Sequence, residues 1–376
     1  MYYENKKEKR KETVVVYFFM VVIVLLLCVL VLKFDNGGVP QAQSNYETTK
    51  LSGTGNNINT AIDEEKEKYE IIEKSTKCIV GISKLQQSGS SVFLDDAEEK
   101  LGLGSGIIIT DNGYILTNQH VAGNKYSNCY VTLECGDTYS GSVVWEDDNI
   151  DLAIVKISKT NLDYMPLADS DNINLGQDVY AIGNPIGFEF QRTVTKGIIS
   201  GIDRTIKIDD DQSIYMEDLI QTDATINEGN SGGALINTKG ELIGVNTVKI
   251  STAEAIGFAV PINIVKPIIE KLVGNNKFEE AYLGLYGYDK EVIPYLDHNL
   301  QIECGVYIAT ILFDSPLYKS EVMEGDVIME IDHIKINKMN DLKKYIYSKN
   351  PGDTVNLIIK RKTKEFSVNI KLGYKM

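Results

Sequence analysis

The chain has 376 residues, with 53 acidic and 38 basic side chains that give a formal net charge of −15 at pH 7. Nucleic-acid-binding proteins need a basic surface to neutralise phosphates, so this charge argues against that class. The length allows more than one hydrophobic core. The 21 tyrosines and only 8 prolines, beside many isoleucines and valines, are typical of a strand-rich globular protein.

The N-terminal part of the chain combines a basic tail with an apolar run. Residues 1–12 carry five lysine and arginine side chains, and residues 13–32 contain no charged side chain. An apolar helix of about 20 residues crosses a hydrocarbon core of about 30 Å. We therefore predict a cytoplasmic tail over 1–12 and an uncleaved transmembrane signal anchor over 13–32. The positive-inside rule then places the rest of this single-pass cell-membrane protein outside the cytoplasm.

A cleaved signal peptide is the alternative interpretation of the same run. Its apolar region is usually shorter, about 7–15 residues, and ends at a small-x-small cleavage site. Here Lys33–Phe34–Asp35 follows the run, and Gln41–Ala42–Gln43 is a poor site. These features favour the anchor.

Residues 33–68 predict a flexible linker between the anchor and the folded part of the chain. They are rich in Asn, Gly, Thr, Ser and Gln and show almost no apolar periodicity. The charged run 63–69 is compatible with the start of a helix, but we interpret it as a solvated segment.

His120 is one of only three histidines, and it stands where a predicted hairpin ends. Residues 105–110 are largely apolar, and Asn112–Gly113 between two apolar runs is typical of a tight hairpin turn. The chain therefore reaches His120 as it leaves a sheet, which exposes the imidazole at the sheet edge. A histidine is the usual base that takes the proton of a nucleophilic serine.

Asp151 is the best candidate for the carboxylate that holds this imidazole. The apolar run 152–157 follows it, so Asp151 stands at the mouth of a buried strand. A carboxylate in this role fixes the tautomer of the ring and stabilises its protonated form. Asp147 and Asp148, just upstream, are interpreted as solvated turn residues.

Ser231 lies in the glycine-rich stretch 225–235, which reads T-I-N-E-G-N-S-G-G-A-L. Glycines at this density indicate unusual backbone dihedrals or close approach to another group. The stretch suits a nucleophilic serine whose neighbouring N–H groups, from Gly229 and Ser231, point at an oxyanion. A tight turn between two strands is the alternative.

The three candidate residues follow one another as His120, Asp151 and Ser231. Chymotrypsin-like double-barrel proteases use this order, whereas α/β-hydrolases place the serine first. No G-x-S-x-G elbow surrounds Ser231. The order therefore argues for a protease and against an esterase of the α/β-hydrolase fold.

Six blocks of the chain closely resemble the HtrA/Deg family of serine proteases. They read T-N-Q-H-V-A-G, N-I-D-L-A-I-V-K-I, A-I-G-N-P-I-G, T-V-T-K-G-I-I-S-G, Q-T-D-A-T-I-N-E-G-N-S-G-G-A-L-I-N and I-G-F-A-V-P-I-N. The resemblance implies a mainly β, chymotrypsin-like double β-barrel protease domain over 69–275 and one PDZ domain over 276–376. The two six-stranded barrels are expected over about 78–158 and 177–261.

The resemblance also implies an activity and partners. Members are ATP-independent serine endopeptidases that degrade unfolded or misfolded proteins in quality control and stress response. They need no cofactor or metal, and their PDZ domains bind C-terminal peptides. The segment before the first barrel helps form a homotrimer or higher oligomer, and Tyr69, Ile71 and Ile72 lie in the matching place.

Individual catalytic residues carry over from the resemblance. His120, Asp151 and Ser231 match the family's catalytic triad. Gly229 and Ser231 match the donors of the oxyanion hole, with Asn230 oriented between them. The loop near residues 185–197 matches a region whose order controls the oxyanion hole in relatives that switch between active and inactive states.

Substrate-binding residues are expected in two segments. Thr225, six residues before the nucleophile, matches the base of the S1 pocket, and Ile226 lies next to it. Neither is charged, which predicts a preference for small or medium apolar P1 residues. Val245, Asn246 and Thr247 are expected to form the strand edge that pairs with substrate.

The PDZ domain should bind peptides at a carboxylate-binding loop. That loop consists of Tyr282, Leu283, Gly284 and Leu285. Gly284 lets the backbone turn its N–H groups towards a peptide C-terminus. Residues 341–348 predict the helix beside the groove, with Asn340 near its cap. Asp332–His333 departs from the usual Asn–Gly turn.

One competing class remains open, a catalytically weak or inactive scaffold in which the PDZ domain captures peptides. Metal chemistry is not expected, because His298 and His333 have no Cys or His neighbours at metal-ligand spacing. The five cysteines do not form a disulfide framework, and Cys129 and Cys135 are interpreted as small buried apolar residues.

Overall fold

The computed structural model describes residues 56–85, 101–184, 192–209, 214–227, 229–249, 255–275, 278–296 and 300–375. The predicted tail over 1–12, the predicted anchor over 13–32 and the first part of the predicted linker lie outside these ranges. None of the helices in the described ranges is both long and apolar enough to span a membrane.

Helix α2 (Asn56–Lys77) begins inside the segment that was expected to be a flexible linker. The expectation is wrong for 56–68, because the charged run supports a helix with exposed pairs four residues apart, such as Lys66–Glu70 at 4.0 Å. The last turns of α2 also gain tertiary support. Ile72 packs against the buried core, and Ile71 lies so close to Gly240 that a Cβ there would meet its side chain at 2.8 Å.

The first barrel closes from six antiparallel strands in the order β1-β2-β3-β6-β5-β4. Its strands are β1 (Ile79–Leu85), β2 (Leu101–Ile108), β3 (Tyr114–Thr117), β4 (Asn128–Thr132), β5 (Thr138–Asp147) and β6 (Leu152–Ile157). Side chains that alternate along a strand fill the interior, as the period of a half-buried strand requires. The short helix α3 (Gln119–Ala122) follows β3 and carries His120.

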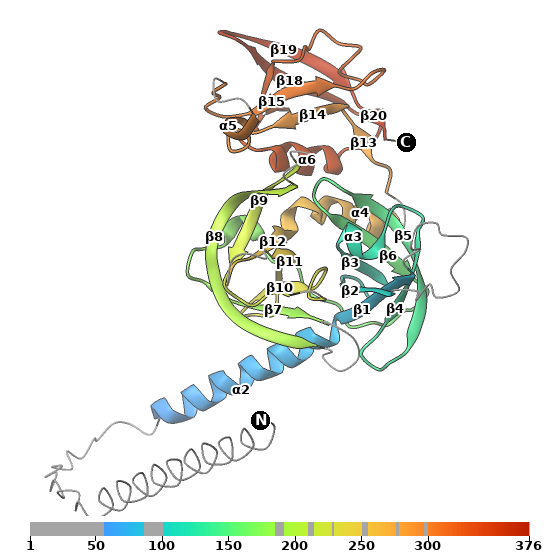
Figure 1. Ribbon diagram of the computed structural model, residues 1–376, viewed down its shortest axis with the longest axis vertical. Coiled ribbons are helices and arrows are strands. Elements are labelled where there is room, and N and C mark those ends of the chain that lie inside the picture. The colour runs from blue at the N-terminus through green and yellow to red at the C-terminus, as the bar shows by residue number, and fades with distance from the viewer. Residues whose placement is uncertain are drawn as a thin grey trace, which may run out of the picture. The chain divides into compact units, whose positions relative to one another are not determined.

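The second barrel closes from six more strands in the order β10-β11-β12-β9-β8-β7. Its strands are β7 (Asp178–Gly183), β8 (Thr193–Asp209), β9 (Ile214–Thr222), β10 (Ala234–Asn237), β11 (Leu242–Lys249) and β12 (Gly257–Pro261). The turns η1 (Ser170–Asn172) and η3 (Ile262–Ile264) and the helix α4 (Lys266–Asn275) complete this part. The predicted pair of six-stranded barrels is confirmed, and Figure 1 shows them side by side.

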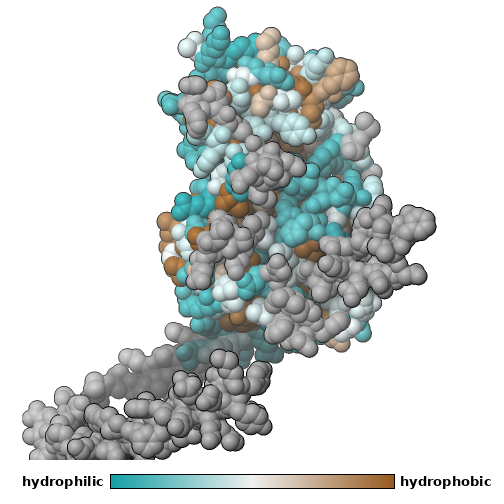
Figure 2. Space-filling view, in the orientation of Figure 1, coloured by the Kyte–Doolittle hydropathy of each residue, from teal (hydrophilic) through white to brown (hydrophobic). Residues whose placement is uncertain are grey.

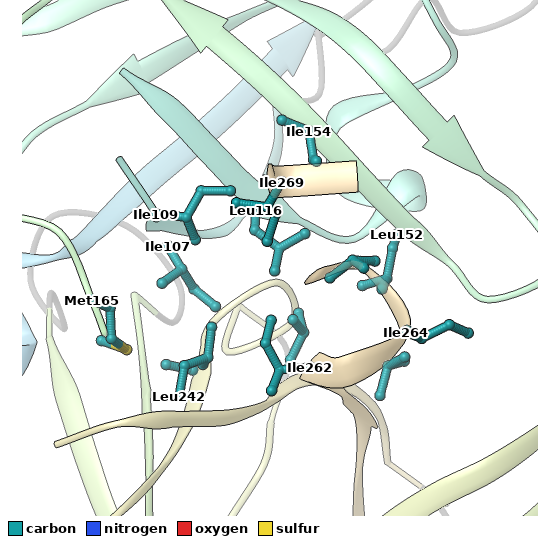
Figure 3. Packing of buried hydrophobic residues seen from close by; sticks show 14 of the residues in the cluster. Ile107, Ile109, Leu116, Leu152, Ile154, Met165, Leu242, Ile262, Ile264 and Ile269 are labelled. Carbon is teal, nitrogen blue, oxygen red and sulfur yellow. The ribbon is translucent and has the colours of Figure 1, made fainter. Parts of the chain in front are cut away.

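A continuous apolar core joins the two barrels. Buried side chains from β2, β3 and β6 face side chains from β11, η3 and α4. Figure 3 shows this packing for Ile107, Leu116, Leu152, Leu242 and Ile262. Burying such surface is the main favourable term in folding, so the line where the barrels meet is held rigidly. The catalytic candidates lie near that line, His120 on α3 and Asp151 and Ser231 on loops.

The PDZ domain has its own core around a sheet in the order β14-β15-β16-β18-β19, with β17 paired to β16. Its strands are β13 (Ala281–Tyr282), β14 (Leu285–Tyr288), β15 (Val306–Ile311), β16 (Val327–Ile331), β17 (Ile334–Lys335), β18 (Thr354–Arg361), β19 (Lys364–Lys371) and β20 (Gly373–Tyr374). Helices α5 (Ile293–Leu296) and α6 (Met339–Ser348) complete the domain. Tyr347 of α6 packs edge-on against Trp145 of β5, with ring centroids 5.9 Å apart.

Two local expectations in the PDZ domain are refined by the structure. Helix α6 begins at Met339, and the carboxylate of Asp341 accepts the N–H of Lys338 at 3.2 Å, so Asn340 is not the cap. The Asp332–His333 turn has positive φ at both residues, +45° and +69°, as a tight hairpin turn demands. Its carboxylate accepts from the backbone N–H of Asn356 at 2.7 Å, which holds the turn without glycine.

The surface agrees with the acidic, polar composition. Hydrophilic residues cover most of the described face in Figure 2, and apolar residues appear as separate patches. Phe313 of the PDZ domain is the most exposed large apolar side chain among the described residues, at 85%. Scattered exposed apolar side chains are normal for a globular protein.

Candidate active site

Asp151 is held in place from several sides at the start of β6. Its carboxylate accepts from the backbone N–H of His120 at 3.0 Å and from the Thr247 hydroxyl at 2.8 Å. Its carbonyl accepts from Gln119 N at 3.2 Å and from Asn118 Nδ2 at 2.8 Å. Its φ of +52° is left-handed, so these bonds hold a backbone conformation that few non-glycine residues adopt.

The imidazole of His120 contacts this carboxylate directly. Nδ1 lies 2.9 Å from Oδ1 and 2.8 Å from Oδ2 of Asp151. A proton on Nδ1 donates to the carboxylate and leaves Nε2 as an acceptor. The side chain of His120 is half exposed, so Nε2 remains accessible to a reacting group.

Asp147 supports the turn that leads to Asp151, and the sequence analysis misjudged it. Its side chain is buried rather than solvated, and it accepts the N–H of Asn149 at 2.9 Å. Two side chains of α6 also reach it: the Tyr347 hydroxyl donates to Asp147, and Lys343 Nζ lies 3.6 Å away. Burial by itself raises the pKa of Asp147, but Lys343 and the Tyr347 hydrogen bond outweigh it and lower that pKa to about 2.

Ser231 lies on the loop that precedes β10. Its hydroxyl donates to the carbonyl of Thr247 at 3.0 Å. Thr247 therefore touches both sides of the site, because its own hydroxyl donates to Asp151. The structure brings His120, Asp151 and Ser231 together around this one threonine.

Glycines shape the loop around Ser231. Gly229 has a φ of +92° and Gly232 a φ of +80°, a region that favours glycine. A Cβ on Gly232 would meet the carbonyl oxygen of Ser105 at 2.2 Å. Within the part of the chain that the structure describes, the N–H groups of Gly229 and Ser231 donate to no carbonyl. These are the two N–H groups that the family resemblance assigns to the oxyanion hole.

Asn230 lies between these two N–H groups and is buried. Its own N–H donates to Asn227 O at 3.0 Å, and its Nδ2 reaches Thr225 O at 3.4 Å. Its side-chain oxygen finds no partner among the described residues. Asn230 thus orients the loop through its backbone.

The two residues expected at the S1 pocket have different environments in the structure. Thr225 is exposed, and its carbonyl accepts from the Thr195 hydroxyl at 2.9 Å. Ile226 is buried in the core of the second barrel, against Gly257. Its side chain therefore packs the barrel and does not line a pocket.

The predicted substrate-pairing edge is wrong for two of its three residues. Val245 pairs with β10 and β12 at once, and Asn246 pairs with β12 while its N–H donates to Gly233 O at 2.9 Å. Both are buried and have no free edge to offer. The register with β12 breaks after Asn246, so Thr247 is the first residue released from this pairing.

The PDZ domain contains a groove of about 230 Å³ between β14 and α6. All four residues of the predicted carboxylate-binding loop line it: Tyr282, Leu283, Gly284 and Leu285. Gly284 has a φ of +84°, and a Cβ there would meet Ser315 at 2.1 Å, so only glycine fits. The turn 147–149 of the protease domain also lines the groove.

The described residues offer no metal centre, since they contain no group of three or more suitable His, Cys, Asp or Glu side chains. His333 is exposed in its turn, whereas His298 lies outside the described residues. Cys129 is buried as expected, but the expectation is wrong for Cys135, which is exposed beyond the end of β4.

Comparisons with known proteins agree with this arrangement. The family model "Trypsin-like peptidase domain" matches residues 104–245, and the model "PDZ domain" matches residues 271–372. The serine protease Do-like HtrA of Bacillus subtilis is 38% identical over 326 residues, which cover 81% of this chain and 72% of the relative. The periplasmic pH-dependent serine endoprotease DegQ of Escherichia coli is 33% identical over 77% of this chain and 64% of the relative.

Solved structures give the same result. The HtrA-type protease AlgW with tripeptide superposes with a TM-score of 0.60 at 29% identity and covers 82% of this chain and 97% of that structure. The fold and the matched domains define a trypsin-like serine endopeptidase with one PDZ domain. The chain belongs to the HtrA/Deg family of serine proteases.

Proposed function

We propose that this endopeptidase degrades unfolded or misfolded proteins outside the cytoplasm, without ATP, and that C-terminal peptides bound to its PDZ domain regulate it. His120, Asp151 and Ser231 are its catalytic residues. The observation that carries this assignment is the set of bonds that joins His120 to Asp151, Asp151 to Thr247, and Thr247 to Ser231.

Acylation uses all three residues. His120 Nε2 accepts the Ser231 proton while Oγ attacks the carbonyl carbon of the scissile peptide bond. The Asp151 carboxylate stabilises the imidazolium that forms. The tetrahedral oxyanion accepts hydrogen bonds from the N–H groups of Gly229 and Ser231, and losing one such donor typically costs about 2.7–4 kcal/mol of transition-state stabilisation.

Collapse of the tetrahedral intermediate breaks the C–N bond. The imidazolium of His120 gives its proton to the departing amine, and the acyl group stays on Ser231. A water molecule then gives a proton to His120 and attacks the acyl carbon. The second intermediate collapses, the carboxylic acid product leaves, and the proton returns to Ser231.

The preference at P1 is proposed to be for small or medium apolar residues. Thr225, which matches the base of the S1 pocket, is uncharged and offers no partner to a Lys or Arg side chain. A peptide-library digest analysed by mass spectrometry tests this preference. Efficient cleavage after Lys or Arg would contradict it.

Location and assembly are further parts of the proposal. The uncharged run 13–32 supports a single-pass membrane anchor with a cytoplasmic N-terminus, and the name of the relative DegQ places that protein in the periplasm. Homotrimer formation is proposed for the segment with Tyr69, Ile71 and Ile72, of which Tyr69 is 63% exposed. Accessibility of the C-terminal domains to protease added to intact cells tests the topology.

Ser231→Ala is the decisive variant for the proposed activity. It should abolish casein degradation while circular dichroism and the unfolding temperature stay close to wild type. Retained degradation would refute the assignment. If wild type is also inactive, with and without C-terminal peptides, the scaffold interpretation replaces it; the direction of the Ser231 hydroxyl, which donates to Thr247 O and not to His120, favours that alternative.

A further inference from the structure

Ser105 is a fully buried residue of β2 that contacts the nucleophile loop of the other barrel. Its backbone N–H donates to the carbonyl of Ser231 at 2.9 Å. Its hydroxyl donates to the carbonyl of Gly229 at 2.5 Å. A single residue of the first barrel therefore holds the carbonyls of Gly229 and Ser231, the two residues proposed as donors of the oxyanion hole.

The direction of the Ser105 hydroxyl bond is set by a third contact. The backbone N–H of Asn184 donates to Ser105 Oγ at 2.7 Å, so the oxygen already serves as an acceptor there. A hydroxyl has one proton to give. The hydroxyl proton of Ser105 is therefore donated to the carbonyl oxygen of Gly229.

These bonds fix two peptide planes of the loop, each directly after the plane that carries the N–H of Gly229 or of Ser231. A peptide unit is planar, so holding its carbonyl and its N–H sets the orientation of the whole unit. The unit after Gly229 is held by Ser105 at the carbonyl and by Asn227 at the N–H of Asn230. The unit after Ser231 is held by Ser105 at the carbonyl and by Asn246 O at the N–H of Gly232.

Close packing leaves the loop little room to shift around Ser105. A Cβ on Gly183 would meet Asn230 Oδ1 at 2.6 Å and Ser105 Oγ at 3.0 Å. A Cβ on Gly232 would meet Ser105 O at 2.2 Å. The hydroxyl thus lies in a space closed by two glycines, where interiors tolerate even small changes poorly.

We propose that Ser105 is a positioning residue of the oxyanion hole: it fixes the peptide units directly after Gly229 and Ser231 and thereby restricts the adjoining units, whose N–H groups point at the substrate. This inference rests on the proposed function, because it assigns a part in the same reaction. Ser105 touches neither substrate nor reacting atoms. It acts through the orientation of the loop.

Ser105→Ala removes the hydroxyl and keeps nearly the same volume. Removal of a whole oxyanion donor lowers kcat by roughly 10²–10³-fold, so misalignment of one is expected to lower kcat by about 10-fold to 100-fold. KM for a peptide substrate should change little, because ground-state contacts are unaffected. The affinity for a peptidyl aldehyde, whose hemiacetal oxygen occupies the oxyanion hole, should fall by the same factor as kcat.

Thr117→Val is the matched control. Thr117 is also fully buried, and its hydroxyl donates at 2.6 Å to the carbonyl of Ser105 itself. The variant loses the same kind of buried hydrogen bond next to the same residue, without freeing Gly229. It should lose a similar amount of unfolding temperature but retain wild-type kcat and aldehyde affinity.

The outcomes separate cleanly. The proposal is supported if kcat and aldehyde affinity fall together in Ser105→Ala but not in Thr117→Val. It is overturned if Ser105→Ala keeps wild-type kcat, or if both variants lose activity in proportion to lost stability. Should Ser105→Ala not fold, Ser105→Cys, with a weaker donor, must give an intermediate kcat. Wild type and Ser231→Ala are assayed in the same experiment. Equal peptide cleavage by these two proteins would refute the proposed function rather than the role of Ser105.

Discussion

The two barrels contribute to the active site in different ways. On the side of the first barrel, the carboxylate and carbonyl of Asp151 are bound by groups from the same barrel, and Thr247 is the one described residue of the other barrel that adds a bond. On the side of the second barrel, the nucleophile loop is also held by Ser105, which binds two of its carbonyls across the line where the barrels meet. The acid–base pair is thus built locally, whereas the nucleophile and oxyanion groups depend on contact between barrels.

This difference indicates that activity can be regulated through the contact between the barrels. Disturbing the contact between barrels should misalign the oxyanion hole while His120 and Asp151 stay paired. The hydroxyl of Ser105 also binds the N–H of Asn184, and the side chain of Asn184 accepts the N–H of Arg192 at 2.6 Å. A change at Asn184 or Arg192 should therefore shift the nucleophile loop more than it shifts the His120–Asp151 pair.

Asp151→Asn should have the largest effect on the first-barrel side. Asparagine replaces one acceptor oxygen by an NH2 donor and carries no negative charge, so the ring loses its fixed tautomer and the stabilisation of its charged form. We expect kcat to fall by on the order of 10⁴-fold. Peptide kinetics across a range of pH measure this. An Asp151→Asn enzyme with nearly full kcat would show that the locally built pair is not the base.

Ser105→Ala, with its expected 10-fold to 100-fold loss of kcat, tests the other side of the comparison. If the second barrel held its loop alone, Thr117→Val and Ser105→Ala would behave alike. A selective loss in Ser105→Ala would show that the first barrel orients the oxyanion hole.

Tyr347→Phe tests whether the His120–Asp151 pair of the first barrel also depends on contacts with the PDZ domain. The change leaves the buried Asp147 carboxylate without its hydroxyl donor, which should lower the free energy of unfolding by about 1–3 kcal/mol. Lys343 and Asn149 still hold Asp147, so kcat should fall far less than in Asp151→Asn. Denaturant unfolding and peptide kinetics measure the two effects. A loss of kcat as large as that of Asp151→Asn would contradict the local construction of the pair.

Glu217→Gln is expected to have the smallest effect on activity and a clear effect on the pH dependence of stability. Burial first, then the charge of Asp289 and a hydrogen bond to it, raises the pKa of Glu217 to about 9 from the usual 4.5. Between pH 4.5 and about pH 9 the folded protein keeps this proton, whereas the unfolded protein releases it. The free energy of unfolding therefore falls as pH rises through this range.

The variant should flatten that decline, because glutamine does not titrate. Asp147 behaves in the opposite sense: its pKa is lowered to about 2, so its contribution is present above about pH 4 and lost only as pH falls towards 2. Unfolding curves between pH 5 and pH 9 for wild type and Glu217→Gln measure the difference. Parallel curves would contradict the assignment to Glu217.

The barrels were predicted from the resemblance to the HtrA/Deg family, whereas local patterns predicted single strands and turns within them. The first barrel was expected to start near residue 78 and the second to end near residue 261, and the structure begins β1 at Ile79 and ends β12 at Pro261. Alternating and continuous apolar runs, with turns of Asn, Asp and Gly between them, determine such strands locally. The same patterns put His120, Asp151 and Ser231 at element edges.

Contacts between distant parts of the chain could not be predicted in this way. Ser105 meets Gly229 across 124 positions, and Asp147 meets Tyr347 across 200. Nothing in the neighbourhood of Asp147 distinguishes a buried carboxylate from a solvated one until α6 is packed against it. Val245 and Asn246 were misjudged for a related reason, since edge and interior strands look alike in sequence.

Covalent labelling with a fluorophosphonate, followed by peptide mapping, tests the central claim most directly. A serine with a working base and oxyanion hole reacts far faster than any other serine in the chain. We expect a single modified residue, Ser231, and a parallel loss of proteolysis. Modification of a different residue, or full proteolysis by protein whose Ser231 is completely blocked, would contradict it.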